Sequence, residues 1–216
     1  MYKNGLHAQP KHNIKRRLKP NHRATTQVEH ESPETRGYYK IKGAADAFNF
    51  VFKDKIVLDI GSSTGGFTKY ALNHGAKQVI AVEKGTNQME YPLRLNQKIE
   101  LHEKTDIFDF PPIKPDVILA DVSFISLTKV LLYAKQNFSA NNPNYLVMLK
   151  PQFEAKPDQL NRGVIKNEKT RRQIIKKFES WLKQNGFIII KKRDNTLFGK
   201  NGNQERFYWL KITQKI

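Results

Sequence analysis

Asp121 and Lys150 are the residues whose types and positions suit chemistry most directly. Asp121 follows the apolar run Val117–Ala120, and Lys150 follows the apolar run Leu146–Leu149. A charged side chain at the end of a buried strand rarely lacks a partner. We therefore expect either a structural ion pair between the two residues or a functional site at these strand ends.

A glycine-rich turn follows another apolar segment. Residues 57–67 read VLDIGSSTGGF, so a strand-like run ends in a turn from Gly61 to Gly66 and a helical segment follows from Phe67. Backbone N–H groups in a strand–turn–helix arrangement can approach a ligand closely. No Lys-Ser or Lys-Thr follows the last glycine, and the spacing is not G-x-G-x-x-G. Neither a phosphate-binding loop nor a dinucleotide fingerprint is therefore indicated.

The next apolar run, Val79–Val82, ends in the acidic residue Glu83. A carboxylate at the tip of this strand suits the two hydroxyl groups of a ribose. Together with the glycine turn, it indicates a nucleoside ligand without a pyrophosphate, and we expect S-adenosylmethionine. The alternative is an ordinary glycine turn beside an ordinary surface glutamate.

The segments that must position these residues alternate between strand and helix patterns. We predict strands at 55–60, 78–83, 99–102, 116–121, 145–150, 187–192 and 205–212, and helices at 40–52, 66–74, 87–95, 126–137 and 168–184. This alternation predicts an α/β fold with a mostly parallel seven-stranded sheet and helices on both faces. Ligands of such sheets bind at the carboxyl ends of the strands, where Gly61, Glu83, Asp121 and Lys150 lie.

The composition indicates a polyanionic partner. The 216 residues carry a formal net charge of +18, which favours nucleic acid over a merely solvated basic surface or an acidic membrane face. The absence of cysteine excludes disulfides, thiolate zinc sites and cysteine nucleophiles. No apolar run is long enough to span a bilayer, and the N-terminus lacks the apolar core of a secretory signal. We therefore expect a cytoplasmic protein with no membrane partner.

The N-terminal segment is basic and has no periodic pattern. The first acidic residue is Glu29, and lysines and arginines mixed with histidines and prolines precede it. We predict a flexible basic arm over residues 1–34, which can neutralise RNA phosphates, and a folded domain over residues 35–216. His7 and His12 lack supporting carboxylates, so no metal site is predicted.

Five segments resemble, in order, motifs of the TlyA (haemolysin A) family of rRNA 2'-O-ribose methyltransferases, whose catalytic domain is FtsJ-like. They are R-G-Y-Y-K-I at 36–41, D-I-G-S-S-T-G-G-F-T at 59–68, A-D-V-S-F-I-S at 120–126, L-K-P-Q-F-E at 149–154 and G-N-Q-E at 202–205. The resemblance runs from about Thr35 to Lys211 and implies a Rossmann-like, S-adenosylmethionine-dependent methyltransferase fold. Tyr38 departs from the family's R-G-G-x-K-L motif, and the basic arm occupies the place of the family's N-terminal RNA-binding domain.

The resemblance implies a catalytic tetrad of Lys40, Asp121, Lys150 and Glu205. We predict Lys150 as the base, which requires part of it to be neutral, with Lys40 and Asp121 positioning the hydroxyl and Glu205 orienting the lysines. Asp106 is expected to accept from the adenine amino group, with a turn-forming aspartate as the alternative. The predicted cofactor-binding residues are Gly61, Ser63, Gly65, Phe67, Glu83, Asp106 and Asp121.

The implied activity is methyl transfer from S-adenosylmethionine to a 2'-hydroxyl of RNA, with a cytidine of rRNA or of a ribosomal subunit as the expected target. One alternative is a non-catalytic RNA-binding or ribosome-assembly factor on the same fold. A pore-forming haemolysin would need a membrane span or an amphipathic strand array, and neither is visible. DNA-base methyltransferases often carry Asn/Asp-Pro-Pro-Tyr/Phe after the fourth strand, where this chain has Asp-Val-Ser-Phe.

Overall fold

The computed structural model describes residues 34–199 and 201–213, so nearly all of the predicted basic arm lies outside the described residues. The helices are α1 (Arg36–Phe48), α2 (Gly66–Asn73), α3 (Tyr91–Arg94), α4 (Leu127–Asn137) and α5 (Glu168–Gln184). The strands are β1 (Ile56–Ile60), β2 (Gln78–Val82), β3 (Ile99–His102), β4 (Val117–Ala120), β5 (Asn144–Leu149), β6 (Leu160–Asn161), β7 (Val164–Ile165), β8 (Phe187–Asp194) and β9 (Arg206–Ile212). No helix of this described part is both long and apolar enough to cross a membrane.

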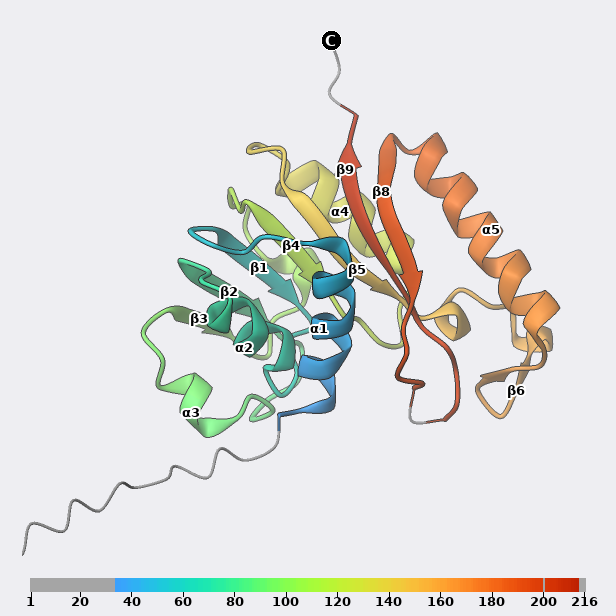
Figure 1. Ribbon diagram of the computed structural model, residues 1–216, viewed down its shortest axis with the longest axis horizontal. Coiled ribbons are helices and arrows are strands. Elements are labelled where there is room, and N and C mark those ends of the chain that lie inside the picture. The colour runs from blue at the N-terminus through green and yellow to red at the C-terminus, as the bar shows by residue number, and fades with distance from the viewer. Residues whose placement is uncertain (1–33, 200, 214–216) are drawn as a thin grey trace, which may run out of the picture. The chain divides into compact units, whose positions relative to one another are not determined.

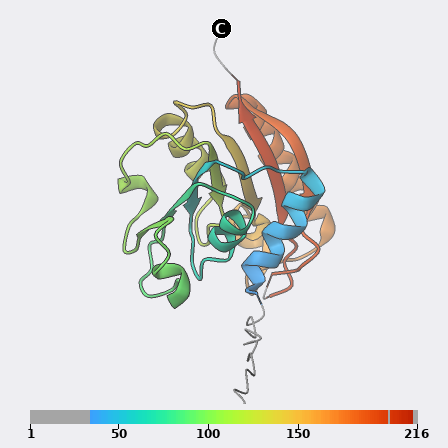
Figure 2. The same cartoon turned by 60° about the vertical axis from the view of Figure 1, so that its left-hand side comes forward.

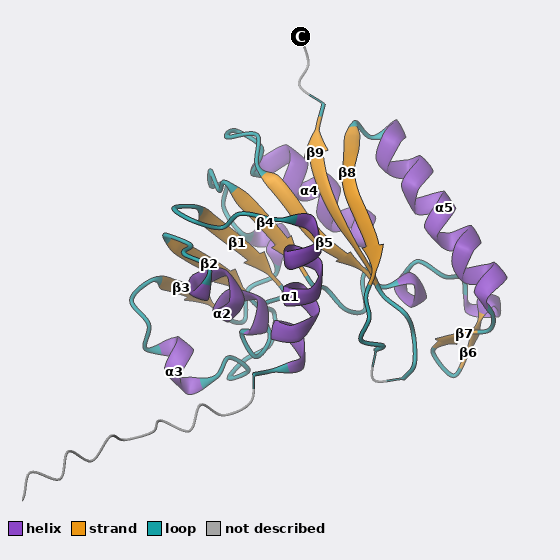
Figure 3. Cartoon of the chain, viewed as in Figure 1, coloured by secondary structure: helices purple, strands orange, loops and turns teal. Residues whose placement is uncertain are grey.

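A seven-stranded sheet forms the centre of the fold, with the strand order β3-β2-β1-β4-β5-β9-β8 (Figure 1). The first five strands pair in parallel, and β9 runs antiparallel to both of its neighbours. The predicted α/β fold with a mostly parallel seven-stranded sheet is therefore confirmed. Figure 3 shows helices on both sides of this sheet, which is also as predicted.

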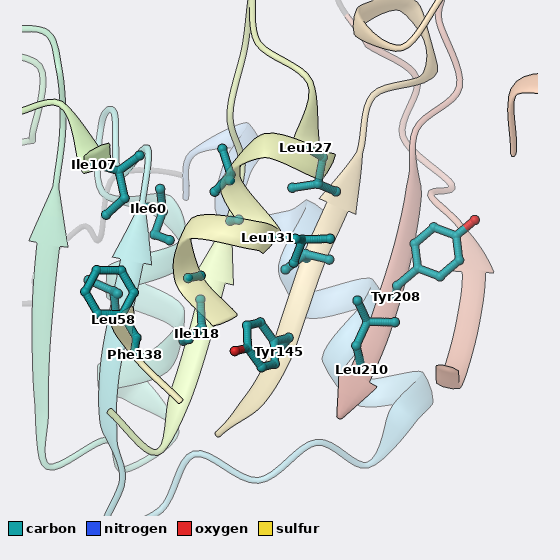
Figure 4. Packing of buried hydrophobic residues seen from close by; sticks show 14 of the residues in the cluster. Leu58, Ile60, Ile107, Ile118, Leu127, Leu131, Phe138, Tyr145, Tyr208 and Leu210 are labelled. Atoms are coloured by element: carbon teal, nitrogen blue, oxygen red, sulfur yellow. The ribbon is translucent and has the colours of Figure 1, made fainter. Parts of the chain in front are cut away.

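Two large apolar cores hold α1, α2, α4 and α5 against the sheet. On one face α1 and α2 pack on residues such as Val57 and Leu119, and on the other face α4 and α5 pack on residues such as Leu58 and Ile118 (Figures 1 and 2). Figure 4 shows the α4 side, where Leu131 packs among side chains of the central strands. Because both faces of the central strands are covered, β1, β4 and β5 are almost continuously apolar.

Helix α1 begins and ends four residues earlier than predicted. The hydroxyl of Thr35 accepts from the backbone N–H of Tyr38 at 3.3 Å and caps the first turn. Asn49 ends the helix in the left-handed conformation, with φ 53°. As a result, Lys40 lies within the helix and is buried, rather than at an exposed helix start.

The predicted helix over 87–95 was too long, because only Tyr91–Arg94 is helical. Asn87 has a φ of 54°, and the carboxylate of Glu103 accepts from the backbone N–H groups of Asn87 and Gln88 at 3.0 and 3.1 Å. These contacts hold residues 87–88 as a loop.

The β6–β7 hairpin was not predicted from the sequence. Its two-residue turn has positive φ at both Arg162 and Gly163.

Candidate active site

The register of the sheet brings three of the predicted site residues to one level. Ile60, the last residue of β1, pairs with Val82 of β2 and with Ala120 of β4, and both of these also end their strands. The next residues along the chain are Gly61, Glu83 and Asp121, which therefore start neighbouring loops at the carboxyl edge of the sheet. This is the edge where parallel α/β sheets bind ligands.

The four predicted catalytic residues form two ion pairs. Lys150 Nζ lies 2.7 Å from Asp121 Oδ1, and Lys40 Nζ lies 2.6 Å from Glu205 Oε2. All four side chains line one cavity of about 640 Å³. Glu205 is 3% exposed and Lys40 is 8% exposed, so their ion pair lies at the enclosed end of this cavity.

Each ion pair has a further polar neighbour that fixes its orientation. Lys150 Nζ donates to Ser123 Oγ at 2.7 Å. Asn195 Nδ2 donates to Glu205 Oε2 at 3.3 Å, and the backbone N–H of Asn195 donates to the carbonyl of Glu205 at 2.8 Å. A small hydroxyl-bearing ligand in this cavity would meet ammonium donors and carboxylate acceptors whose directions are already set.

A second cavity, of about 800 Å³, adjoins the first. The two cavities share five lining residues: Gly61, Ser63, Asp121, Ser123 and Phe124. Glu83 lies in the second cavity, where its carboxylate accepts from the backbone N–H groups of Ser63 at 2.9 Å and Gly85 at 2.7 Å. The acidic tip of β2 is therefore held against the glycine turn that follows β1.

Asp106 lies in the same second cavity and also forms a turn. Its Oδ1 accepts from the backbone N–H of Phe108 at 3.2 Å, which caps a short 3₁₀ helix at Ile107–Asp109. Its Oδ2 pairs with Lys84 Nζ at 2.8 Å, and this hydrogen bond lowers the pKa of Asp106 below its ordinary value. The turn-forming role weighed in the sequence analysis is thus present, and the residue still faces the cavity.

Two positions of the turn require glycine, and the atoms that a Cβ would meet differ between them. Gly61 has a φ of 80°, and a Cβ there would lie 2.9 Å from the carbonyl oxygen of Asp121. Gly65 has a φ of 91°, and a Cβ there would lie 2.4 Å from Leu93 Cδ1. Gly61 lines both cavities, whereas Gly65 lines neither and shapes the turn before α2.

The glycine turn has the donor set that a nucleoside sulfonium cofactor needs. Ser62 is 4% exposed and lines the first cavity, yet its hydroxyl has no hydrogen-bond partner within the described residues. Phe67 is buried beside it, stacks on Phe207 with ring centroids 6.0 Å apart, and gives the cavity an apolar wall. An unpaired hydroxyl, a carboxylate and close-approach glycines fit S-adenosylmethionine.

Asp59, which lies within β1, is a further polar residue near the site and was not among the predicted site residues. It is fully buried, and its Oδ2 accepts from Thr68 Oγ1 at 2.7 Å while its Oδ1 has no partner in the described part. Burial raises the pKa of Asp59 to about 7, and the nearby carboxylates of Asp121 and Glu83 add to this effect. In the sequence, the feature that indicates a buried carboxylate here is an aspartate within an otherwise apolar strand.

Phe124 is a further residue at the site that the sequence analysis did not single out. It is 92% exposed, has a φ of 65° and packs on Phe153 with ring centroids 5.3 Å apart. It lines both cavities, and Phe153 lines the first. A bulky residue rarely adopts this backbone conformation, so the loop after β4 holds an aromatic ring in solvent at the cavity mouth.

No group of three or more His, Cys, Asp or Glu residues that could hold a metal ion occurs in residues 34–199 and 201–213. The polar groups of the two cavities are instead lysines, carboxylates, hydroxyls and backbone amides. These groups suit an organic ligand that carries hydroxyl and amino groups.

Residues 33–212 match the model of the FtsJ-like methyltransferase family. The 23S rRNA (cytidine-2'-O)-methyltransferase TlyA of Campylobacter jejuni is 36% identical over 180 residues, which are 81% of this chain and 69% of that protein. The Bacillus subtilis protein YqxC, named as an rRNA methyltransferase, is 34% identical over 177 residues. That match covers 79% of this chain and 63% of the longer YqxC.

A solved structure supports the same family assignment. A hemolysin-named protein from Streptococcus thermophilus superposes with a TM-score of 0.80 and 30% sequence identity. The match covers 87% of this chain and 70% of that chain. The matched part of the Streptococcus thermophilus protein thus shares both sequence and fold with the described domain.

Proposed function

Because the chain belongs to the FtsJ-like methyltransferase family and, within it, to the TlyA group, we propose that it methylates a ribose 2'-hydroxyl of RNA. The observation that carries this proposal is the pair of lysine–carboxylate ion pairs in one cavity, Lys150–Asp121 and Lys40–Glu205. The methyl donor is S-adenosylmethionine, whose sulfonium supplies an activated methyl group.

For the cofactor, we assign the second cavity to the adenosine and the glycine turn to the methionine. Glu83 would accept hydrogen bonds from the ribose hydroxyls, and Asp106 faces the place of the adenine. Ser62 and Ser63 offer hydroxyl groups to the polar end of the methionine. Asp121 lines both cavities, so it can contact cofactor and substrate together.

For the chemistry, we assign Lys150 as the base. A lysine can act as a base only as the neutral amine, and the Nζ of Lys150 lies 2.7 Å from Asp121 Oδ1 and donates to Ser123 Oγ. The neutral amine of Lys150 would accept the proton of the 2'-hydroxyl as its oxygen attacks, and S-adenosylmethionine, when bound, would supply the activated methyl group and leave as the neutral thioether. Asp121 stabilises the ammonium formed on Lys150, and Lys40, held by Glu205, donates to the substrate oxygen.

The surroundings of the cavity favour a nucleotide as the substrate. The exposed ring of Phe124, supported by Phe153, offers a flat face on which the target base can stack. The net charge of +18 suits an RNA backbone. We propose rRNA as the RNA and a cytidine as the nucleotide, because the similar Campylobacter jejuni protein is named for that reaction. A ribosomal substrate implies a cytoplasmic enzyme.

We propose residues 1–34 as a basic arm that contacts RNA phosphates beside the methyltransferase domain of residues 35–216. The support comes from the sequence alone, in which no acidic residue precedes Glu29. The arm would contribute affinity for RNA and no catalytic group.

The test is product analysis after transfer of labelled methyl groups from S-adenosylmethionine. Free rRNA, small subunits and large subunits are each incubated with the protein and then digested to nucleosides. We expect the label in 2'-O-methylcytidine with at least one of these substrates. Label in a methylated base would contradict the assigned chemistry, and cofactor binding without product on any substrate would favour a non-catalytic RNA-binding or assembly factor.

A further inference from the structure

Two apolar side chains lie in solvent on the loop that joins β8 to β9. Leu197 is 37% exposed and Phe198 is 53% exposed, although Asn195 and Asn203 on the same loop are buried. The next described residues of the loop, Gly199 and Asn201, line the cavity that holds the two ion pairs. The apolar pair therefore lies at the edge of the candidate active site.

Hydrogen bonds within the loop support this exposed position. Asn195 Oδ1 accepts from the backbone N–H of Leu197 at 3.3 Å, and the backbone N–H of Gly199 donates to the carbonyl of Asn203 at 2.7 Å. The Asn203 side chain accepts from Ile165 N and donates to the carbonyl of Gly163, both at 3.0 Å, which fixes the loop to the β6–β7 hairpin. Figure 1 shows the loop and the hairpin projecting beyond the same edge of the sheet.

The burial of the catalytic residues restricts which part of an RNA can lie next to this loop. Lys40 and Glu205 are almost fully buried, so a 2'-hydroxyl that reaches them must belong to a nucleotide that has left its base stack. The nucleotide's departure exposes the apolar faces of the neighbouring bases. Proteins that distort nucleic acids commonly cover such faces with inserted Phe or Leu side chains.

We propose that Leu197 and Phe198 form an apolar wedge that enters the RNA base stack beside the target nucleotide. This inference rests on the proposed function. The wedge is separate from Phe124 and Phe153, which follow β4 and β5 and line the cavity that we assign to the target nucleotide. The strongly basic chain favours RNA over an apolar protein surface as the partner of these side chains.

The direct test uses tryptophan fluorescence. Phe198→Trp adds a fluorophore to the wedge, and Ile188→Trp is the matched control, because Ile188 is 46% exposed at the opposite end of β8. The signal of the wild type, which contains Trp181 and Trp209, is subtracted. With a 20-residue oligouridine, we expect stacking to quench the added fluorescence of Phe198→Trp and to leave Ile188→Trp unchanged. Unquenched Phe198→Trp with RNA bound, as measured by anisotropy, would overturn the proposal.

A kinetic test separates the wedge from the proposed function. The double variant Leu197→Ser/Phe198→Ser should lower kcat/KM about 10-fold on folded rRNA, with unchanged cofactor affinity and Tm, and Phe198→Trp should retain activity. Equal kcat/KM of the wild type and the double variant on folded, protein-free rRNA would overturn the proposed wedge. A lower kcat/KM of the double variant only with ribosomal particles would indicate that the loop contacts a protein instead. If the wild type methylates no RNA, the proposed function fails, and the fluorescence result still decides whether the loop stacks on RNA.

Discussion

Replacing Asp59 by asparagine should make the stability of the domain less dependent on pH. Asp59 is fully buried in β1, one of its oxygens has no partner in the described part, and its pKa is about 7. The folded state therefore holds the Asp59 proton more tightly than the unfolded chain, in which an aspartate has a pKa near 3.8. The contribution of Asp59 to stability is accordingly largest below about pH 4, falls as the pH rises towards 7 and is level above 7.

The size of the effect follows from this pKa difference. A difference of about three units corresponds to about 4 kcal/mol, which is an upper estimate for a buried group. Between pH 5 and pH 8 the free energy of unfolding of the wild type should fall by about 3 kcal/mol because of Asp59. This decrease should be absent in Asp59→Asn. The asparagine variant should therefore become more stable relative to the wild type with each step upward in pH.

Urea unfolding of wild type and Asp59→Asn at pH 5, 6, 7 and 8 measures this difference. Asp158→Asn is the control for removal of a carboxylate, since Asp158 is exposed. A stability difference between wild type and Asp59→Asn that stays constant across this pH range would exclude a raised pKa of Asp59 in the folded state. It would mean that Asp59 is already ionised in the folded protein at pH 5.

Three further predictions concern cofactor binding, stability and RNA binding. Glu83→Gln should weaken S-adenosylmethionine binding about 10-fold in calorimetry, because a neutral amide accepts ribose hydroxyls less well than a carboxylate; an unchanged Kd would remove Glu83 from the cofactor site. Gly61→Ala should destabilise the domain by about 1–3 kcal/mol in thermal unfolding, because its Cβ would lie 2.9 Å from the Asp121 carbonyl at a φ of 80°; wild-type stability would contradict that geometry. Deleting residues 1–28 should weaken RNA binding and flatten its salt dependence, whereas an unchanged salt slope would exclude the arm as the electrostatic contact.

The sequence predicted the architecture well, because its buried parallel strands are short apolar runs that end in polar residues. The runs before Gly61, Glu83 and Asp121 located three strands and the edge of the sheet where those residues lie together. Lys40 and Glu205 were different, because each alone is an unremarkable helix or strand-end residue. Only the family motifs singled them out, and their catalytic roles stay predictions.

The features that differ from the sequence-based predictions depend on local backbone geometry in some cases and on contacts between distant segments in others. The start of α1 is fixed by the Thr35 cap, and the loop at Asn87 is held by Glu103, 16 residues away. The exposure of Phe124 follows from its positive φ, which no local pattern around an aromatic residue predicts. The apolar neighbours of Asp59 along the chain indicate a buried carboxylate, but its unpaired oxygen and its raised pKa depend on the packing around the strand.

The central claim is that Lys150 is the base for methyl transfer to a ribose hydroxyl. Labelled methyl transfer to rRNA should be compared for wild type, Lys150→Ala and the control Lys114→Ala, whose side chain is exposed before β4. We expect a 10²- to 10⁴-fold lower kcat for Lys150→Ala with cofactor binding retained, and unchanged turnover for Lys114→Ala. Turnover of Lys150→Ala at the wild-type rate would contradict the mechanism.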